Sequence, residues 1–490
     1  MPRSQYAISR GQTFNDGKDL DANNLGRKKR LALPILLYML FVVLPVHFNA
    51  GPLALTGLRA LLLVMIVPLT VNLLLGKYGK LLWTDILFFV HLLWAGLALG
   101  LNNPDEAVEF FGSVLIEFMG GYILARAYIR SAADFVALCR LFFFLVICTL
   151  PFAVLEAQTG RATIPALIRS IPSLGSVQDF HNDLAGMRFG LNRTQVVFVH
   201  PIHYGLYCSV AFALAFVSFK GIYSDLKRIM ITLLIMMCVF FSLSSGALLA
   251  VVLQIVLILW AWFFNPVKFR WMLLMAFMIV TYIVVDLLSN RTPLRVFLTY
   301  ATFSAHNGYW RYLIFEWGMV NVRANPIFGL GLNDWVRPHF MNSGSMDNFW
   351  LLNAVRYGIP GFAALFLGYV LAIWKIGRVP FKAKSQIWYI RRGWMFAFLG
   401  LSFTLATVHV WGTIFSFTFF LFGAGVWMIN YGSTSASENH LQGSSKQASR
   451  RVKAGLVVTE PEIQTSAAIE QVLDPRSVSF TRFPSKVLKD

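Results

Sequence analysis

Long apolar runs separated by short polar turns fill most of the chain between residues 31 and 431. A helix needs about 20 apolar residues to cross a bilayer. The last apolar stretch is too long for one helix, and we divide it between His409 and Gly412. The pattern then predicts twelve membrane-spanning helices, over residues 31–49, 53–75, 81–101, 107–128, 133–155, 201–219, 226–244, 246–264, 270–288, 349–374, 393–410 and 412–431. The predicted fold class is therefore an all-α polytopic membrane protein.

Composition agrees with this interpretation. The chain of 490 residues is 57% hydrophobic and 13% charged, whereas soluble domains contain about 25% charged residues. The net charge of +19 would indicate nucleic-acid binding in a soluble protein, but basic loops on one side of a membrane explain it here. The cysteines all lie in apolar runs, which favours small buried side chains over disulfides or a metal cluster; they are Cys139, Cys148, Cys208 and Cys238.

The distribution of Lys and Arg predicts the orientation. Residues 1–30 are polar and basic, and we expect no cleavable signal peptide because the first apolar run is itself a predicted span. Basic loops alternate with short loops that lack Lys and Arg, at 50–52, 102–106, 242–246 and 409–412. This alternation places both termini in the cytoplasm. The tail, residues 432–490, is rich in Ser, Gln and Lys and is expected to be disordered.

The same topology places two long polar loops, 156–200 and 289–348, on the outer side. The positive-inside rule applies to short loops, so it neither forbids nor explains the arginines in these two long loops. The guanidinium group binds phosphate through two parallel hydrogen bonds and stays charged. The arginines therefore form a clamp for a lipid-linked phosphate or pyrophosphate, or they are solvated surface charges, or they bind anionic headgroups. The arginines are Arg161, Arg169, Arg188 and Arg193 in the first loop, and Arg291, Arg295, Arg311, Arg323 and Arg337 in the second.

The first loop runs directly into a predicted span. Arg193 lies shortly before Pro201, which suits the first turn of a helix. His200 and His203 are one helical turn apart. A metal pair is one interpretation, but without a nearby carboxylate or cysteine the signal is weak, and we assign no metal. A hydrogen-bonding or acid–base role and packing at the membrane surface remain the alternatives.

The second loop contains an amphipathic segment, residues 309–320, with Arg311 on its first turn. Its apolar side chains are expected to lie in the membrane interface. Residues before a proline leave the helical region, so the helix should end at Asn325. Gly329 and Gly331 then allow a turn with positive φ. The expected interfacial side chains are Trp310, Ile314, Phe315 and Trp317.

Asp347 and Asn348 precede the next predicted span. Asp347 is either the N-cap of that helix or a base facing the outer compartment. Arg356 would lie roughly 13 Å deeper along the helix, and a charge at that depth implies a cavity or a partner. The run Gly358-Ile-Pro360-Gly361 predicts a kink.

Taken in order, these phrases resemble the O-antigen ligase/polysaccharide polymerase superfamily of membrane glycosyltransferases. They are Trp310-Arg311, Asn325-Pro-Ile-Phe-Gly-Leu-Gly331, Asp347-Asn348 and Arg356-Tyr-Gly-Ile-Pro-Gly361, within a region from 242 to 376 and with weaker support at 188–205. The resemblance implies a GT-C-like fold in the bacterial inner membrane, with both large loops periplasmic. It also implies glycan transfer from undecaprenyl pyrophosphate without a metal or other cofactor.

The resemblance further implies roles for single residues. Arg193, with Arg188 as second choice, matches the arginine of the first loop, and Arg311 matches that of the second. Both would hold the pyrophosphate. Asp347 stands where the family often has His before Asn, so either Asp347 or His339 would be the base. This departure favours a polymerase of exopolysaccharide or O-antigen repeat units. Further candidates are Arg356 for the pyrophosphate, with His200, His203 and Asn348 nearby.

Two other functions remain open. A ligase would transfer finished glycan to lipid A-core, and only the acceptor separates it from a polymerase. A transporter or flippase of lipid-linked sugars would tend to show internal repeats; none is evident between the two halves, and polar loops on one side favour an enzyme. The expected partners are the lipid-linked donor, the glycan acceptor, membrane lipid, and chain-length and export proteins, with no nucleic acid.

Overall fold

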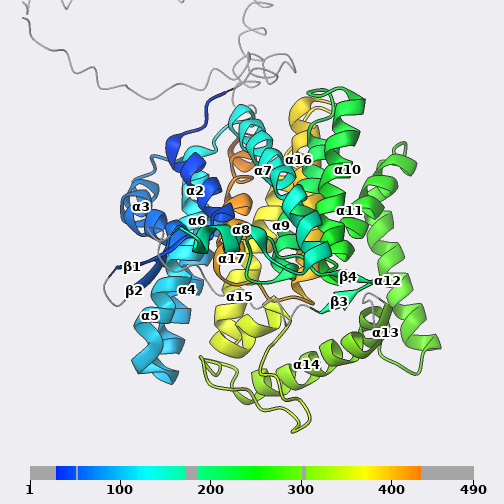
Figure 1. The fold of residues 1–490 in the computed structure, drawn as a ribbon. Helices are drawn as coiled ribbons and strands as arrows, with labels where there is room; N and C mark the ends of the chain where they lie inside the picture. Colours follow the sequence, from blue (N-terminus) through cyan, green and yellow to red (C-terminus); the bar gives the residue numbers. More distant parts are fainter. Residues whose placement is uncertain (1–28, 51–52, 172–185, 301–304, 432–490) are drawn as a thin grey trace, which may run out of the picture. The chain divides into compact units, whose positions relative to one another are not determined.

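The computed structural model describes residues 29–431, except 51–52, 172–185 and 301–304. Nearly all of the predicted cytoplasmic N-terminus (1–30) and the whole predicted disordered tail (432–490) lie outside the described residues. The described part consists mainly of helices (Figure 1). Short strands occur in two hairpins, β1 (His47–Ala50) with β2 (Leu53–Thr56) and β3 (Met187–Arg188) with β4 (Leu191–Asn192).

The helices follow the apolar runs of the sequence. Two of them continue through π-helical turns, at Ile116–Gly120 and Leu214–Ser218. The helices are α2 (Leu33–Val43), α3 (Gly57–Leu74), α4 (Trp83–Asn102), α5 (Pro104–Leu115), α6 (Gly121–Tyr128), α7 (Ala132–Thr159), α8 (Thr163–Arg169), α9 (Pro201–Ala213), α10 (Asp225–Phe241), α11 (Ser245–Phe263), α12 (Arg270–Leu288), α13 (Pro293–Tyr300), α14 (Ala305–Ala324), α15 (Phe349–Arg378), α16 (Gln386–Leu405) and α17 (Gly412–Gly423).

Nine helices among the described residues are long and apolar enough to cross a membrane. The predicted all-α polytopic fold is confirmed, whereas the count of twelve spans is not. The remaining predicted spans correspond to α2, α10 and α16, which are helical but are not among the nine. The predicted spans were wrong in detail at 44–49 and 53–56, because the chain leaves the helix before Pro45 and forms the β1–β2 hairpin.

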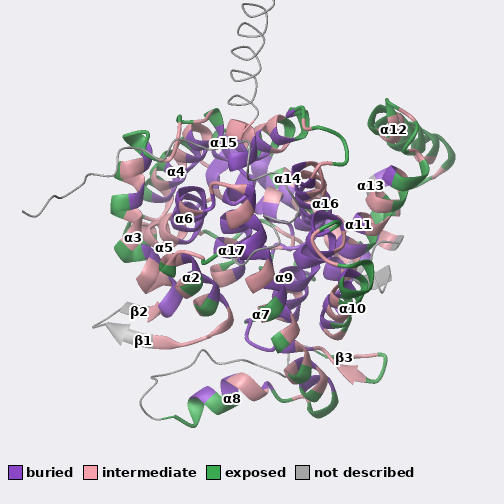
Figure 2. Ribbon diagram, turned by 90° about the horizontal axis from the view of Figure 1, so that it is seen from above, coloured by how far each residue is buried: buried purple, intermediate pink, exposed green. Residues whose placement is uncertain are grey.

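Two helices occupy the interior. The segment Pro201–Ser218, which contains α9, is 89% buried over its most apolar window, and Gly412–Tyr431 is 78% buried. Helix α9 packs against α7, α10, α11 and α16, and α17 packs against α6. Helix α12 has no buried residue and lies at the edge in Figure 2. Elements that touch α9 or α17 are therefore held firmly, which fixes the loops at their ends.

The predicted kink in α15 is confirmed. Gly358 has φ 71° and ψ −179° inside the helix, two residues before Pro360. The kink breaks the hydrogen-bond pattern of the helix and leaves backbone carbonyl groups free to accept other hydrogen bonds. N–H groups of the turn after α14 donate to these carbonyls. The N–H of Leu330 donates to the carbonyl of Val355 at 2.8 Å, and the N–H of Gly331 donates to that of Arg356 at 2.9 Å. The two motifs of the second loop thus form one backbone joint.

Glycine is required on both sides of this joint. Gly329 has φ +65°, and a Cβ there would lie 2.4 Å from the carbonyl oxygen of Val355. A Cβ on Gly358 would lie 2.1 Å from the carbonyl oxygen of Ile327. The predicted positive φ of Gly329 and Gly331 is confirmed. The spacing of these motifs therefore reflects close backbone packing as well as chemistry.

Helix α14 confirms the predicted amphipathic helix and ends at Ala324, before Asn325-Pro326. It lies across the lower end of the helices in Figure 1 and packs against α15. The sequence predicted that its apolar side chains would lie in the membrane interface, but they pack against other side chains of the protein instead. Ile314 is buried in a second hydrophobic cluster with Leu351 and Leu352, and Trp310, Phe315 and Trp317 are partly buried against it. Packing against α15 replaces the lipid contact.

Candidate functional site

A tight hairpin presents two of the four arginines of the first loop. Strands β3 and β4 pair Arg188 with Leu191, and the connecting residues Phe189 and Gly190 both have positive φ. Positive φ at both turn residues matches the right-handed twist of a two-residue hairpin. Arg193 follows β4 directly. The hairpin therefore carries Arg188 and Arg193 in one rigid unit.

A buried carboxylate fixes the chain just after Arg193. Glu156, on the last turns of α7, is only 2% exposed. Its Oε1 accepts a hydrogen bond from the N–H of Gln195 at 2.9 Å, and its Oε2 accepts one from that of Val196 at 2.9 Å. Sequence reasoning missed Glu156. The signal was a carboxylate near the end of an apolar run, where a buried charge needs partners.

Arg188 is anchored to the turn between α10 and α11. Its Nη1 donates a hydrogen bond to the carbonyl oxygen of Leu243 at 2.6 Å. The N–H of Thr194 donates to the carbonyl of Phe241 at 3.2 Å. Leu243 has φ 44°, an uncommon conformation for a non-glycine residue. The first loop is therefore attached to the end of α10 on both sides of β4.

Arg311, on α14, joins Arg188 and Arg193, although more than a hundred residues separate it from them in sequence. Burial, followed by the charges of Arg188 and Arg311, lowers the pKa of Arg193 to about 10. Burial also lowers the pKa of Arg311; Asp347 opposes this shift, and Arg188 adds to it. The structure thus brings together four residues chosen from sequence. We call Arg188, Arg193 and Arg311 the arginine cluster.

The other arginines of the two loops lie elsewhere. Arg161, Arg169, Arg291 and Arg323 are exposed, and Arg337 forms an ion pair with Asp334 at 2.5 Å. Arg295 lies over the rings of Tyr309 and Tyr312. Charge alone did not distinguish these side chains from the cluster, because the distinction depends on how the loops fold.

The histidines form a group next to the cluster. His200 is the N-cap of α9, where its Nδ1 accepts from the N–H of Ile202 at 3.1 Å, and Pro201 occupies the first turn as predicted. Burial, followed by the charges of Arg193 and Arg188, lowers the pKa of His200 from 6.5 to about 4. The ring of His203 lies 4.1 Å from that of Trp411, centroid to centroid. His203 is therefore buried, and His200 half-buried, beside the cluster and the α16–α17 turn.

His409 completes this group, and sequence reasoning used it only to divide two spans. Its ring stacks on Trp411 at 5.4 Å. Burial, followed by the charge of Arg356, lowers its pKa from 6.5 to about 3. Its Nδ1 and the Nε2 of His203 are buried and find no hydrogen-bond partner among the described residues. A histidine in a short turn without other charges was the available signal.

Asp347 is not the N-cap of α15, so that alternative was wrong. Asn348 is the N-cap, and its Oδ1 accepts from the N–H of Leu351 at 3.0 Å. The Oδ1 of Asp347 instead accepts from the hydroxyl of Ser345 at 3.0 Å. His339 is exposed on the 333–341 segment, whereas the charge of Asp347 acts on Arg311. The geometry places Asp347, rather than His339, beside Arg311.

A cleft of about 710 Å³ opens beside the histidines and contains Arg356. The predicted cavity at Arg356 is therefore confirmed; its guanidinium also lies 5.2 Å from the ring of Phe110. Arg59 and Glu117 form an ion pair at 2.8 Å in its wall. The polar side chains that line it are His47, Thr56, Arg59, His91, Glu106, Glu109, Ser113, Glu117, Asn353, Arg356, Tyr357, His409, Trp411 and Thr413.

Comparisons with known proteins support one family. Residues 229–367 match the family model described as O-antigen ligase. The match includes Arg311, Asp347 and the α15 kink, whereas Arg188 and Arg193 lie before it. No curated protein matches the chain. The match indicates a membrane glycan-processing enzyme, a polymerase or a ligase, that acts on lipid-linked glycan. The chain is therefore a polytopic membrane protein in which residues 229–367 are similar to the O-antigen ligase family.

Proposed function

We propose that the protein is a polysaccharide polymerase that joins undecaprenyl-pyrophosphate-linked repeat units at the periplasmic face of the bacterial inner membrane. The observation that carries the proposal is the meeting of Arg188, Arg193 and Arg311 in one partly buried place. Like charges held together in a region of low dielectric cost free energy. An anion that binds there regains this free energy, and a pyrophosphate carries enough charge to do so.

The chemistry requires no metal or other cofactor in this proposal. A hydroxyl oxygen of the acceptor sugar attacks the anomeric carbon of the donor, and the bond from that carbon to the pyrophosphate oxygen breaks. Negative charge then develops on the leaving undecaprenyl pyrophosphate, where the arginine cluster stabilises it. Asp347 is the proposed base that takes the hydroxyl proton, and general-base help contributes roughly 10²–10⁴-fold.

The cleft is the proposed acceptor site. It adjoins the histidine group through His409 and Trp411 and carries the carboxylates Glu106, Glu109 and Glu117. Carboxylates accept hydrogen bonds from sugar hydroxyls, and aromatic rings offer apolar faces to a pyranose. Arg356 in the same cleft suits the pyrophosphate of a lipid-linked acceptor. This arrangement supports transfer between two lipid-linked units.

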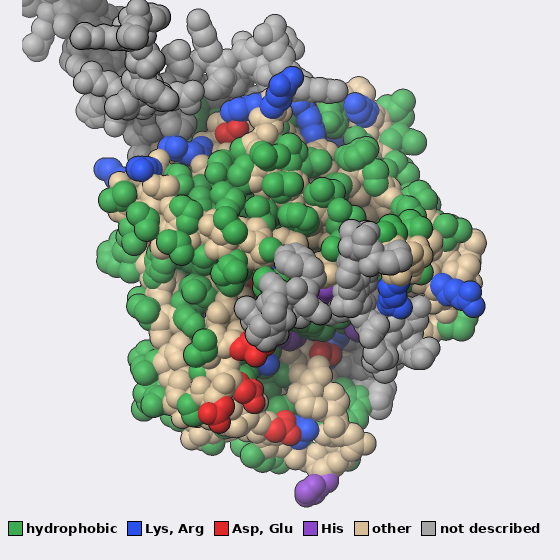
Figure 3. Space-filling model, turned by 60° about the vertical axis from the view of Figure 1, so that its left-hand side comes forward, with side chains coloured by type: hydrophobic (Ala, Val, Ile, Leu, Met, Phe, Trp, Pro, Cys, Tyr) green, Lys and Arg blue, Asp and Glu red, His purple; other side chains and the backbone are tan. Residues whose placement is uncertain are grey.

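Charge distribution supports the proposed orientation. In Figure 3, many of the visible Lys and Arg side chains follow the upper edge, whereas Asp and Glu gather mainly in the lower half. Basic residues concentrate on the cytoplasmic side of membrane proteins. We therefore propose a transmembrane domain at 31–431 with cytoplasmic termini and outward-facing loops at 156–200 and 289–348.

A ligase is the second candidate, because the matching family model is described as O-antigen ligase. It would use the same arginine cluster and transfer finished glycan to lipid A-core. Deletion of the gene separates the two. Single repeat units on the cell surface, or loss of secreted polymer, indicate a polymerase. Full-length polymer that accumulates on undecaprenyl pyrophosphate overturns polymerisation in favour of ligation.

A further inference from the structure

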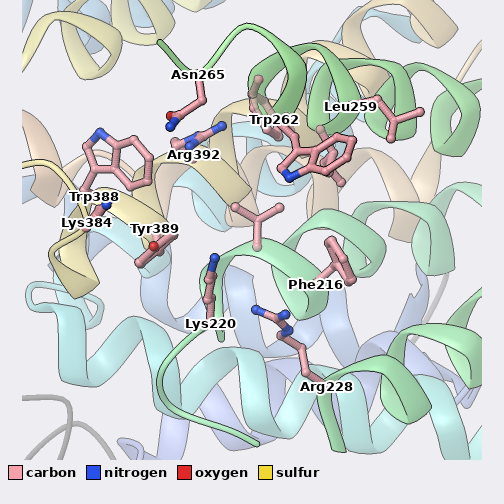
Figure 4. Close-up of a pocket in the computed structure, with 14 residues that line it drawn as sticks. Phe216, Lys220, Arg228, Leu259, Trp262, Asn265, Lys384, Trp388, Tyr389 and Arg392 are labelled. Carbon is pink, nitrogen blue, oxygen red and sulfur yellow. The ribbon is translucent and has the colours of Figure 1, made fainter. Parts of the chain in front are cut away.

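A second cavity, of about 560 Å³, lies between α10, α11 and α16, at their ends away from the arginine cluster (Figure 4). Helix α11 begins two residues after Leu243, beside Arg188, and ends at Phe263, beside this cavity. Its 19 residues span roughly 28 Å at 1.5 Å per residue. The cavity is therefore separate from the proposed active site.

All the charged side chains among the described residues that line this cavity are positive. They are Lys220, Arg228, Lys384 and Arg392, and no Asp or Glu is among the described residues that line it. Figure 4 shows Lys220 and Arg228 on one side of the space and Arg392 on the other. Four cations around one opening repel each other unless an anion lies between them.

Arg228 is the strongest sign of a ligand. It is only 8% exposed. Its Nη2 pairs with the largely exposed carboxylate of Asp225 at 2.9 Å. Its Nε and Nη1 are buried and have no hydrogen-bond partner among the described residues. A buried N–H group without a hydrogen-bond partner costs free energy. Because Arg228 lines the cavity, its two unpartnered donors favour an acceptor group bound there.

Aromatic rings flank the same cations. The guanidinium of Arg392 lies 4.3 Å from the ring of Trp388, and the amino group of Lys220 lies 5.4 Å from the ring of Tyr389. Trp262 also lines the cavity and is 69% exposed. Aromatic and basic side chains together mark the level of lipid headgroups in membrane proteins.

An apolar groove continues from this cavity along α10 and α11. It measures about 260 Å³ and shares Phe216, Ile258 and Leu259 with the charged cavity. The rest of its lining consists of Phe212, Ile229, Thr232, Leu233, Met236 and Ile255. A cationic pocket that opens into an apolar groove has the chemical order of a phospholipid, with its phosphate at the surface and its acyl chain below.

We propose that this cavity binds an anionic membrane phospholipid, with the phosphate on Arg228 and an acyl chain in the α10–α11 groove. Inorganic phosphate offers the same charge but leaves the apolar groove unused. The lipid would tie the start of α10, the end of α11 and the start of α16 together on the side expected to be cytoplasmic. This binding is independent of the proposed glycan transfer.

The test measures lipid retained by the purified full-length protein after delipidation, by native mass spectrometry and melting temperature. Phosphatidylglycerol should bind to the wild-type protein and raise its melting temperature, whereas phosphatidylcholine should not. Each Lys or Arg beside an anionic headgroup changes binding by about fivefold. The variant Lys220→Gln with Lys384→Gln should therefore bind phosphatidylglycerol roughly 25-fold more weakly, and Arg228→Gln should lose binding altogether.

The matched control is Lys77→Gln with Arg378→Gln, two exposed basic residues outside the cavity, which should bind lipid as the wild type does. Both lysines in the test variant are exposed, so its folding should be normal even if Arg228→Gln folds poorly. Equal stabilisation by inorganic phosphate would overturn the lipid assignment. Unchanged phosphatidylglycerol binding in the lysine variant would overturn the site.

Discussion

Arg188 donates a hydrogen bond through Nη1 to the carbonyl oxygen of Leu243 at 2.6 Å. This contact attaches the first loop to the turn between α10 and α11, inside the segment that matches the O-antigen ligase family model. It also holds Arg188 where its charge acts on both Arg193 and Arg311. The arginine cluster is therefore built from two loops on a frame that the helix ends supply.

Removing one guanidinium of the cluster should abolish polymer formation. Each lost charge-stabilising donor typically lowers turnover by roughly 10²–10³-fold. We expect Arg193→Ala and Arg311→Ala each to eliminate high-molecular-weight glycan in cells at normal protein level. Arg323→Ala, an exposed arginine at the end of α14, is the matched control and should behave as wild type. Wild-type polymer length in both cluster variants would contradict the clamp.

The same substitutions should not destabilise the protein. Removal of one of several like charges relieves repulsion, and functional sites often trade stability for activity. The melting temperatures of Arg193→Ala and Arg311→Ala should equal or exceed that of the wild type. A large fall would indicate that these arginines act mainly in folding.

Glu156 should act as a positioning residue for Arg193. In Glu156→Gln one carboxylate oxygen becomes an NH₂ group, so one of the N–H groups of Gln195 and Val196 loses its acceptor. A buried unsatisfied N–H costs about 1–3 kcal/mol. We expect KM for the lipid-linked donor to rise more than kcat falls. Gln158→Ala, exposed on the same helix, should change neither constant. A fall in melting temperature with unchanged KM would reduce Glu156 to a structural role.

Substitution of the two candidate bases, Asp347 and His339, should have different effects on turnover. If Asp347 is the base, Asp347→Asn should lower kcat by roughly 10²–10⁴-fold while the protein stays folded. His339→Ala should retain near-normal turnover, because this histidine is exposed. Asn348→Ala removes the N-cap and should cost about 1 kcal/mol of stability. Steady-state kinetics with unfolding curves separate these effects, and a fully active Asp347→Asn protein would exclude Asp347 as the base.

The joint between the 325–331 turn and α15 should not tolerate a side chain at Gly329. Ala there would need a positive φ and would place its Cβ 2.4 Å from a backbone oxygen. The left-handed conformation alone costs roughly 1–2 kcal/mol, and the clash adds to it. We expect Gly329→Ala to lower the melting temperature and the yield of folded protein. Gly344→Ala is the control, because a Cβ at this position would lie 3.4 Å from its nearest neighbouring atom, which is an ordinary contact.

Stability should fall as the pH drops from about 6.5 toward 4. The folded-state pKa of His200 is about 4 and that of His409 about 3, against 6.5 when unfolded. Between these values the unfolded state binds more protons, so lowering the pH favours unfolding. The double variant His200→Gln, His409→Gln should show a smaller loss of melting temperature over this range. An identical pH dependence in both proteins would contradict the burial of these neutral imidazoles.

Bound donor should weaken this pH dependence. A pyrophosphate on the arginine cluster would offset the charges of Arg188 and Arg193 that now act on His200. The pKa of His200 should then rise toward its ordinary value. A comparison of melting curves with and without undecaprenyl pyrophosphate measures this change in the wild-type protein.

The hydrophobic pattern by itself determined the fold class and most helix positions. Apolar runs long enough to cross a bilayer specify helices because a helix satisfies all its backbone hydrogen bonds within one segment. Local rules also located the kink at Gly358 and the end of α14 before Pro326. They failed at the apolar face of α14, where packing against α15 decides which side chains are covered.

The sequence also identified the kinds of residues that form the site, but it did not determine which of the loop arginines lie together. Three of the nine loop arginines meet in the cluster, because the β3–β4 hairpin and α14 lie close together in space. Glu156 and His409 escaped notice since each lies in another part of the chain and acts through long-range contacts. Local spacing determines which face of a helix a residue occupies, whereas charge interactions depend on distances in space. The tertiary structure alone decided those distances.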